Sequence, residues 1–372
     1  MREEFSVKSF DSLMISRIGP IITGIAVGIL APLLVLHGNP GNMGICVACF
    51  ERDIAGALGF HRAAIVQYIR PEIIGLILGA FLSACAFKEF KPRAGSAPAV
   101  RFFLGVFASV GALIFLGCPW RAYLRLAGGD YNALFGIAGL TTGILIGIGF
   151  MKNTYSLGRA YPAPAEAKAS GLLMPLFALG LLALLLVAPK FGAEGAGPVF
   201  FSEKGPGSLH APWFIALAAT LVIGWLAQRS RFCTIGAIRD MVLTHDGYLF
   251  WGVLALIAAG IGMNYYLGFF KPGFAGQPVA HTNSLWNFLG MVLAGLCFTL
   301  AGGCPGRQLI MAGEGDADAA VFVFGMITGA AVAHNFGLAS SGAGIGANAP
   351  AAFVVGMIFC LAVGFTMRRK SC

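Results

Sequence analysis

The chain has 372 residues, of which 58% are hydrophobic and only 11% are charged. A typical soluble domain carries roughly 25% charged residues, so this composition argues against a water-soluble globular protein and against a disordered chain. The net charge of +9 is found in many nucleic-acid-binding proteins. Membrane proteins also concentrate Lys and Arg in their cytoplasmic loops, and this explanation fits the low total charge better. We therefore expect a lipid bilayer around the chain and no nucleic-acid partner.

Long uncharged stretches predict membrane-spanning helices, each of which needs about 20 residues. Helices are expected because lipid offers no water to unpaired backbone groups, and the strict alternation of a β-barrel is missing. The last stretch is long enough for two spans around a turn near 337–349. In chain order the predicted spans are 18–36, 73–87, 102–120, 131–151, 169–189, 211–228, 247–270, 284–306 and two within 319–367. The predicted fold class is an all-α polytopic membrane protein with about nine or ten transmembrane helices and short re-entrant helices.

The distribution of positive charge predicts the orientation of these spans. Lys and Arg are about twice as frequent on the loops that share a side with both termini, which places both termini in the cytoplasm. The polar N-terminal segment precedes a full-length apolar stretch and lacks the pattern of a cleavable signal peptide, so the first span is expected to be retained.

An internal repeat divides the chain at half its length. Gly-Cys-Pro-x-Arg occurs at Cys118 and again at Cys304, which is 186 residues later, with an Asp twelve residues after each Cys. Cys46 and Cys233 form a second pair, each followed by Arg-Asp. These matches predict a first repeat at 1–188 and a second at 212–372, each with five spans, joined by a periplasmic linker at 189–211. Because five is odd, the second copy is inverted, as in many transporters that bind substrate at the repeat interface.

The repeated loops carry the residues that we predict to bind substrate. Two loops suit short re-entrant helices, and Pro after Cys breaks the other two helices. The free N–H groups at such breaks favour anions, a thiol is a soft partner for sulfur or selenium, and Arg suits oxyanion groups. The predicted substrate-binding residues are Cys46, Cys49, Cys118, Cys233, Cys304, Arg52, Arg121, Arg239 and Arg307.

Other interpretations of these residues remain open. Arg52–Asp53 and Arg239–Asp240 are expected to form structural ion pairs. Asp130 and Asp316 either pair with Arg121 and Arg307 or cap the next helix, and capping is preferred. Cys46-x-x-Cys49 lacks the context of a redox or zinc motif, so no metal and no cofactor are expected. His334 is expected to be buried with its polar groups satisfied.

Several segments resemble the YeeE/YedE family of membrane transporters for sulfur compounds. They are 38–59, 70–75, 115–119, 200–208 and 303–315, and within the family they are most similar to the YedE branch, which is linked to selenium. The resemblance implies a multi-pass protein of the bacterial inner membrane. It also implies that Cys46, Cys118, Cys304 and, less directly, Cys233 pass a thiosulfate-like anion along by S–H···S contacts. Cys49 has no counterpart in the thiosulfate pattern.

The leading hypothesis is therefore a transporter, not an enzyme, that takes up a small selenium- or sulfur-containing anion. A second hypothesis is a membrane thiol relay enzyme that passes sulfur or selenium to a cytoplasmic carrier protein, because Arg52 would favour a reactive thiolate at the Cys46-x-x-Cys49 pair. A third is a membrane scaffold without transport activity, which would explain the Gly-rich spans but not the repeated cysteines.

Overall fold

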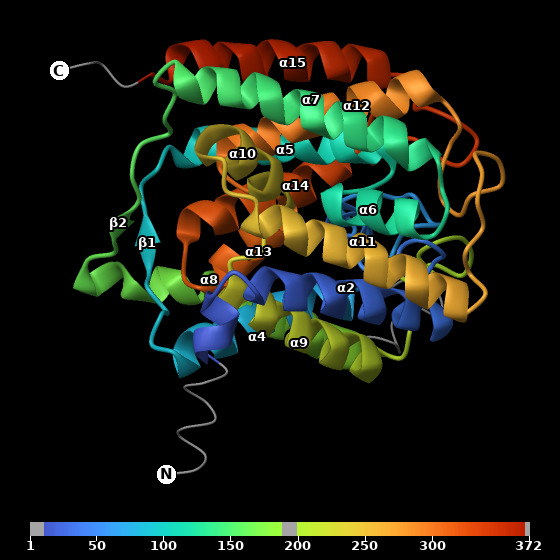
Figure 1. Cartoon of the computed structure of the whole chain (residues 1–372), viewed down its shortest axis with the longest axis horizontal. Helices are drawn as coiled ribbons and strands as arrows, with labels where there is room; N and C mark the ends of the chain where they lie inside the picture. The colour runs from blue at the N-terminus through green and yellow to red at the C-terminus, as the bar shows by residue number, and fades with distance from the viewer. Residues whose placement is uncertain (1–10, 188–198, 369–372) are drawn as a thin grey trace.

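The computed structural model describes residues 11–187 and 199–368, and helices are the dominant secondary structure of this part of the chain (Figure 1). Two short strands, β1 (Arg93–Ala94) and β2 (Tyr161–Pro162), pair antiparallel. The predicted all-α polytopic class is confirmed. Residues 189–198 of the predicted linker lie outside the described residues.

The long apolar helices coincide with the predicted spans. They are α2 (Gly19–Leu36), α4 (Pro71–Ala86), α5 (Pro98–Phe115), α7 (Asn132–Lys152), α8 (Leu173–Val187), α9 (Trp213–Ser230), α11 (Tyr248–Tyr266), α12 (Ser284–Ala301), α14 (Ala317–Asn335) and α15 (Ala349–Thr366). A 3₁₀ helix, η1 (Ala165–Leu172), leads into α8. Within 11–187 and 199–368, nine helical segments are long and apolar enough to cross a membrane. The tenth, α4, has only 16 residues, as the short second stretch predicted.

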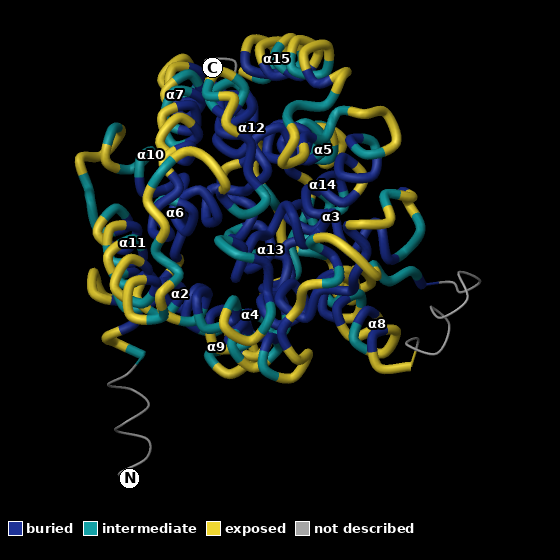
Figure 2. Tube along the Cα trace, turned by 90° about the vertical axis from the view of Figure 1, so that its right-hand side faces the viewer, coloured by how far each residue is buried: buried dark blue, intermediate teal, exposed yellow. Residues whose placement is uncertain are grey.

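Four shorter helices lie among the long ones. They are α3 (Val47–Ala57), α6 (Pro119–Ala127), α10 (Thr234–Thr244) and α13 (Pro305–Gly313). With 11 or 9 residues, none is long enough to cross a membrane alone. Figure 2 shows the buried residues gathered around α3, α6 and α13, while the exposed residues follow the outer helices. These short helices are where the sequence predicts re-entrant or broken segments.

The long helices pack mainly in four pairs, which are α2 with α11, α4 with α9, α5 with α14 and α7 with α12. Each pair joins a helix from before residue 188 to a helix from after residue 212. The most extensive helix contacts therefore connect the two halves of the sequence.

The start of α2 and the end of α15 lie on the same side of the molecule, at the left of Figure 1.

Glycines allow these pairs to approach closely. A Cβ atom added to Gly139 of α7 would collide with the carbonyl oxygen of Phe288, and one added to Gly143 would collide with that of Val292. Gly24 of α2 is placed in the same way against Gly252 of α11. Without a hydrophobic driving force between helices in lipid, such close van der Waals packing stabilises the pairs.

Gly139→Val should therefore destabilise the protein by about 1–3 kcal/mol or more, because the added side chain meets backbone that cannot move aside. The matched control is Gly149→Val on the same helix, where an added Cβ meets nothing within 4 Å. The measurement is the temperature at which half of the detergent-solubilised protein is lost from its monodisperse chromatographic peak. Equal temperatures for the two variants would contradict the packing argument.

Candidate functional site

Each of the four repeated cysteines is the N-cap residue of one short helix. The Sγ atoms of Cys46 and Cys233 accept hydrogen bonds from the backbone N–H groups of Cys49 and Gly236, at 3.4 and 3.3 Å. Cys304 Sγ accepts from Arg307 N at 3.4 Å, and Cys118 caps α6 through its backbone position alone. An N-cap side chain is usually an oxygen from Ser, Thr, Asp or Asn. Here sulfur lies at the positive end of the helix dipole.

Proline reinforces two of these starts. Pro119 and Pro305 are the first residues of α6 and α13. The first residue of a helix has no intrahelical partner for its N–H, so Pro is tolerated there and its fixed φ suits the helix. The sequence prediction of a helix break at each Gly-Cys-Pro is confirmed.

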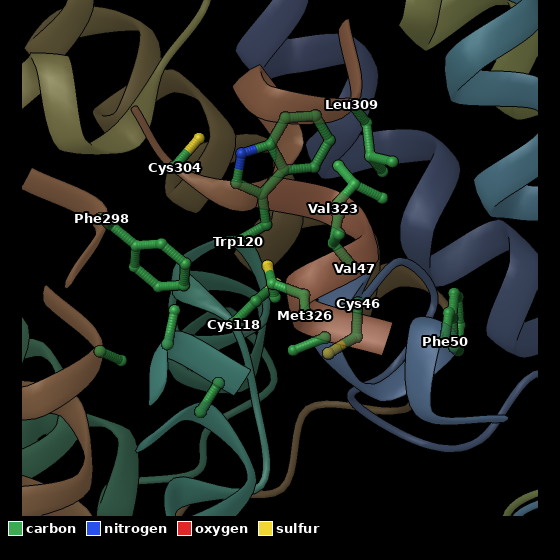
Figure 3. Packing of buried hydrophobic residues seen from close by; sticks show 14 of the residues in the cluster. Cys46, Val47, Phe50, Cys118, Trp120, Phe298, Cys304, Leu309, Val323 and Met326 are labelled. Carbon is green, nitrogen blue, oxygen red and sulfur yellow. The ribbon is translucent and has the colours of Figure 1, made fainter. Parts of the chain in front are cut away.

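The cysteines form two groups. Cys49 N donates to Cys46 Sγ at 3.4 Å, and Figure 3 shows Cys118 next to Cys46, so we call Cys46, Cys49 and Cys118 the first thiol cluster. Cys233 and Cys304 form the second thiol cluster, in which Cys304 N donates to Cys233 Sγ at 3.5 Å. The whole first cluster and Cys304 are fully buried, whereas Cys233 is 6% exposed. The structure thus brings together Cys46 and Cys118 of the first predicted repeat, and Cys233 and Cys304 of the second.

Arg121 is the predicted arginine that lies directly against a thiol. It is fully buried, and its Nη1 donates to Cys49 Sγ at 3.7 Å and to the carbonyl oxygen of Leu116. Its Nε and Nη2 donate to the carbonyl oxygens of Asn42 and Val279 at 3.1 Å. No carboxylate pairs with Arg121 within the described ranges. A buried cation held only by carbonyl dipoles and a thiol suits an anionic ligand.

Arg52 takes part in a buried ion pair, as expected. Its Nη2 lies 2.7 Å from Asp53 Oδ1, and the Nε of Arg70 lies 2.7 Å from the other oxygen, Asp53 Oδ2. Arg70 also donates to the carbonyl oxygens of Leu209 and Pro206 at 3.0 and 2.8 Å. Two guanidinium groups share one carboxylate, so this cluster ties the end of α3 to the start of α4 and to the segment before α9.

The arginines beside the second thiol cluster are more exposed. Arg239 Nε pairs with Asp240 Oδ1 at 2.7 Å, which confirms the second expected Arg–Asp pair, and its side chain is 27% exposed. The Nη1 of Arg307 lies 3.1 Å from Glu314 Oε1, which also pairs with Arg231 at 2.9 Å. The second cluster therefore lies beside a partly solvated charge network.

The structure decides between the two roles that the sequence left open for Asp130 and Asp316. Asp316 caps α14, as preferred, with Oδ1 accepting from Ala319 N at 3.0 Å, but its ion-pair partner is Arg93 at 2.8 Å. Asp130 accepts from the backbone of Asn132 at 3.0 Å and pairs with Arg125 at 2.6 Å. Neither aspartate pairs with Arg121 or Arg307, because each of those arginines is turned toward a different partner.

We did not predict three buried charged residues of the site from the sequence, namely Arg70, Arg125 and Glu314. Arg125 lies four residues after Arg121, one helical turn along α6. This spacing places both arginines on one face of the helix and could have identified Arg125. Arg70 and Glu314 lie in the segments that carry the family resemblance, but no spacing identified their partners. Long-range ion pairs depend on helix packing that a single sequence does not display.

Other candidates lie apart from the thiols. His334 stacks on His61 with ring centroids 4.5 Å apart, and its Nε2 has no hydrogen-bond partner among the described residues, so the expectation of satisfied burial is wrong. Cys297 and Cys360 are buried with their sulfurs 3.2 Å apart, whereas Cys85 is exposed on α4. A search of the described residues finds no metal-binding group of three His, Cys, Asp or Glu side chains.

A cavity with a volume of about 720 Å³ is lined by residues in and next to β1, β2 and η1. None of the predicted substrate-binding residues lines it. Because the chemistry of the repeated loops is concentrated at the buried cysteines, we place the candidate site there and not in this cavity.

The residues 229–361 match the model of a family described as sulphur transport. Two curated proteins are also similar, each named thiosulfate transporter TsuA. That of Escherichia coli (strain K12) is 32% identical over 105 residues, covering 25% of this chain and 26% of the relative. That of Spirochaeta thermophila (strain ATCC 700085 / DSM 6578 / Z-1203) is 31% identical over 99 residues, covering 27% of this chain and 29% of the relative.

The chain thus spans less than a third of the length of either relative in these matches. The family match includes α10 and α13, with Cys233, Cys304, Arg239 and Arg307. Together the matches confirm the predicted resemblance to the YeeE/YedE family of membrane transporters. The assignment to the selenium-linked branch stays a prediction.

The buried ion pair allows a test by symmetry-related substitutions. Asp53→Asn should destabilise the protein by about 3–5 kcal/mol, because it leaves Arg52 and Arg70 buried beside a neutral amide. Asp240→Asn removes the corresponding pair, where Asp240 is 20% exposed, and should cost at most about 1 kcal/mol. Thermal stability of both variants in one detergent would measure the difference. A loss for Asp240→Asn as large as that for Asp53→Asn would contradict the assigned roles.

Proposed function

We propose that the chain is a multi-pass transporter of the bacterial inner membrane, with both termini in the cytoplasm. It takes up a small sulfur-containing anion of the thiosulfate type, or a selenium anion of similar shape, along a pathway lined by the two thiol clusters. The match to the sulphur transport family and the thiosulfate transporters among its relatives support the sulfur anion. Selenium rests on the resemblance described above.

The observation that carries this proposal is the cap of each short helix. A sulfur atom and the free N–H groups of a helix N-terminus lie together at four positions in the protein core. The N–H groups and the helix dipole favour an anion, while the thiols offer weak donors and polarizable acceptors to a sulfur or selenium atom. A thiosulfate-like anion, with oxyanion oxygens and one terminal sulfur, matches both features.

The charges around the first thiol cluster favour the same ligand. Arg121 lies beside Cys49 without an ion-pair partner among the residues that the structure describes, so its charge is available to an anion. A monovalent or divalent anion that binds there gives Arg121 a full negative charge as its partner in place of carbonyl dipoles. Hydrogen bonds to charged groups are stronger than neutral ones, so the guanidinium provides part of the binding free energy.

The two halves are proposed to be inverted copies of one unit, together forming one membrane domain. The order of long and short helices repeats from α2 through α7 and from α9 through α14. The packing of α2 with α11 corresponds to that of α9 with α4, and the packing of α5 with α14 corresponds to that of α12 with α7. Each thiol cluster then serves one face of the membrane, as alternating access requires.

A membrane thiol relay remains the second candidate, because Cys46, Cys49 and Cys118 lie together as three buried thiols. In that function a cysteine thiolate attacks the outer sulfur of thiosulfate, so that a persulfide forms, the S–S bond of thiosulfate breaks and sulfite leaves. A thiol of a cytoplasmic carrier protein then takes the outer sulfur of the persulfide and the cysteine is released as a thiolate. Mass spectrometry of protein quenched during turnover distinguishes the two functions. An adduct at Cys46 or Cys233 favours the relay, and unmodified cysteines during uptake favour the transporter.

The transporter is tested by uptake of ³⁵S-thiosulfate into proteoliposomes. Cys118→Ala and Cys304→Ala should each reduce the initial rate at least about tenfold, since each removes a thiol contact from one cluster. Cys85→Ala is the matched control, because Cys85 is an exposed thiol on α4 that lies outside both clusters. Its rate should equal that of the unmodified protein.

The same experiment identifies the substrate when unlabelled thiosulfate, selenite and sulfite compete for uptake. Unchanged rates in both cluster variants would refute the role of the cysteines. Absence of uptake of every anion by the unmodified protein would refute the transporter itself.

A further inference from the structure

Trp120 connects the two thiol clusters. It is the second residue of α6, two residues after Cys118, and it is fully buried. Its ring lies edge-to-face with Phe232, with centroids 5.8 Å apart, and Phe232 directly precedes Cys233. In Figure 3 the indole lies beside the side chain of Cys304 and above that of Cys118, with Cys46 beyond Cys118. The large side chain thus begins at one cluster and ends against the other.

A glycine on the opposite half makes room for this ring. A Cβ atom added to Gly306 would lie 2.7 Å from Cε2 and Cζ2 of Trp120 and 3.1 Å from its Nε1. Gly306 follows Cys304 by two residues, so it holds in the second repeat the position that Trp120 holds in the first. A second tryptophan at position 306 would not fit beside Trp120. With Gly at 306, the single ring of Trp120 fills the space between the clusters.

The indole N–H is unpaired. Trp120 Nε1 is buried and has no hydrogen-bond partner in the described part of the protein. Buried Trp N–H groups usually find a partner, because leaving a donor unsatisfied costs about 1–3 kcal/mol. An unsatisfied donor beside Gly306, between two groups of thiols, is placed to meet a ligand that passes there.

We propose that Trp120 is the specificity-determining residue of the pathway. Its ring closes the passage between the thiol clusters to water and small ions, and its N–H donates a hydrogen bond to an oxyanion oxygen of the substrate. This inference rests on the proposed function. The thiols recognise the soft sulfur or selenium end of the anion, and the indole recognises the oxygen-bearing end, so only an anion with both ends is bound well.

Trp120→Phe separates the two roles, because it removes the N–H and keeps an apolar ring. The apparent KM for thiosulfate in proteoliposomes should rise at least about tenfold, the loss expected for a hydrogen bond to a charged group. Inhibition of uptake by thiocyanate, a soft sulfur anion without oxyanion oxygens, should change less than twofold. Trp251→Phe is the control, since Trp251 is 60% exposed on α11, and its apparent KM should match that of the unmodified protein.

Two further variants test the closure and guard against misfolding. Trp120→Ala should increase passive chloride leak, measured with a halide-sensitive dye inside the vesicles, whereas Trp120→Phe should not. Gly306→Ala leaves every thiol and the indole in the chain but presses a methyl group on the ring, so it should also raise the apparent KM. Gly149→Ala, in open space, is its control.

An unchanged apparent KM in both Trp120→Phe and Gly306→Ala, with uptake by the unmodified protein intact, would overturn this inference and leave the proposed function standing. An equal loss of thiosulfate and thiocyanate binding in Trp120→Phe would also overturn it, because a structural defect does not distinguish the two anions. If the unmodified protein transports none of the anions, the proposed function fails, and this inference fails with it.

Discussion

The burial of four helix N-termini in the middle of a membrane protein is the constraint on which the rest of this structure depends. The first N–H groups of a helix have no partner within it, and an apolar environment makes each unpaired group costly. Cysteine sulfur accepts one of these hydrogen bonds at three of the four helices, and proline removes a donor at two. The long helix pairs then shield the remaining groups from lipid, so the polar interior exists only because the outer helices pack closely.

The charges follow from the same constraint. On the side of the first thiol cluster, Arg52, Arg70 and Arg121 are buried and held by carboxylate or carbonyl oxygens. On the side of the second cluster, Arg239 and Arg307 are partly exposed and belong to a solvated network. The arginine side chains of the two halves thus differ in solvent exposure, although the halves share the Cys and Arg positions of the repeated motifs. In the proposed mechanism this difference corresponds to a pathway that is closed at the first cluster and nearer to solvent at the second.

The spans were predictable because a stretch without charge is a direct consequence of lipid contact. The boundaries of α2, α7 and α14 agree with the predicted spans to within a few residues, and the helix breaks at Cys118 and Cys304 follow from the adjacent prolines. The partners of the buried charges were not predictable. Arg70 meets Asp53 across a loop, Arg93 meets Asp316 across most of the chain, and Trp120 rests on Gly306. These contacts depend on tertiary packing, and no local pattern in one sequence records that packing.

The central claim is that the two thiol clusters are two ends of one anion pathway, each open in turn to one face of the membrane. Labelling by a small, charged, membrane-impermeant thiol reagent in oriented vesicles tests it most directly. The unmodified protein is used, because variants that lack either cluster are expected to transport poorly, and mass spectrometry locates the label at Cys46, Cys49 and Cys118 or at Cys233 and Cys304. The account predicts that each cluster is labelled during turnover from one face only, that the two faces are opposite, and that thiosulfate protects both. Labelling of both clusters from the same face, or labelling that thiosulfate does not slow, would contradict it.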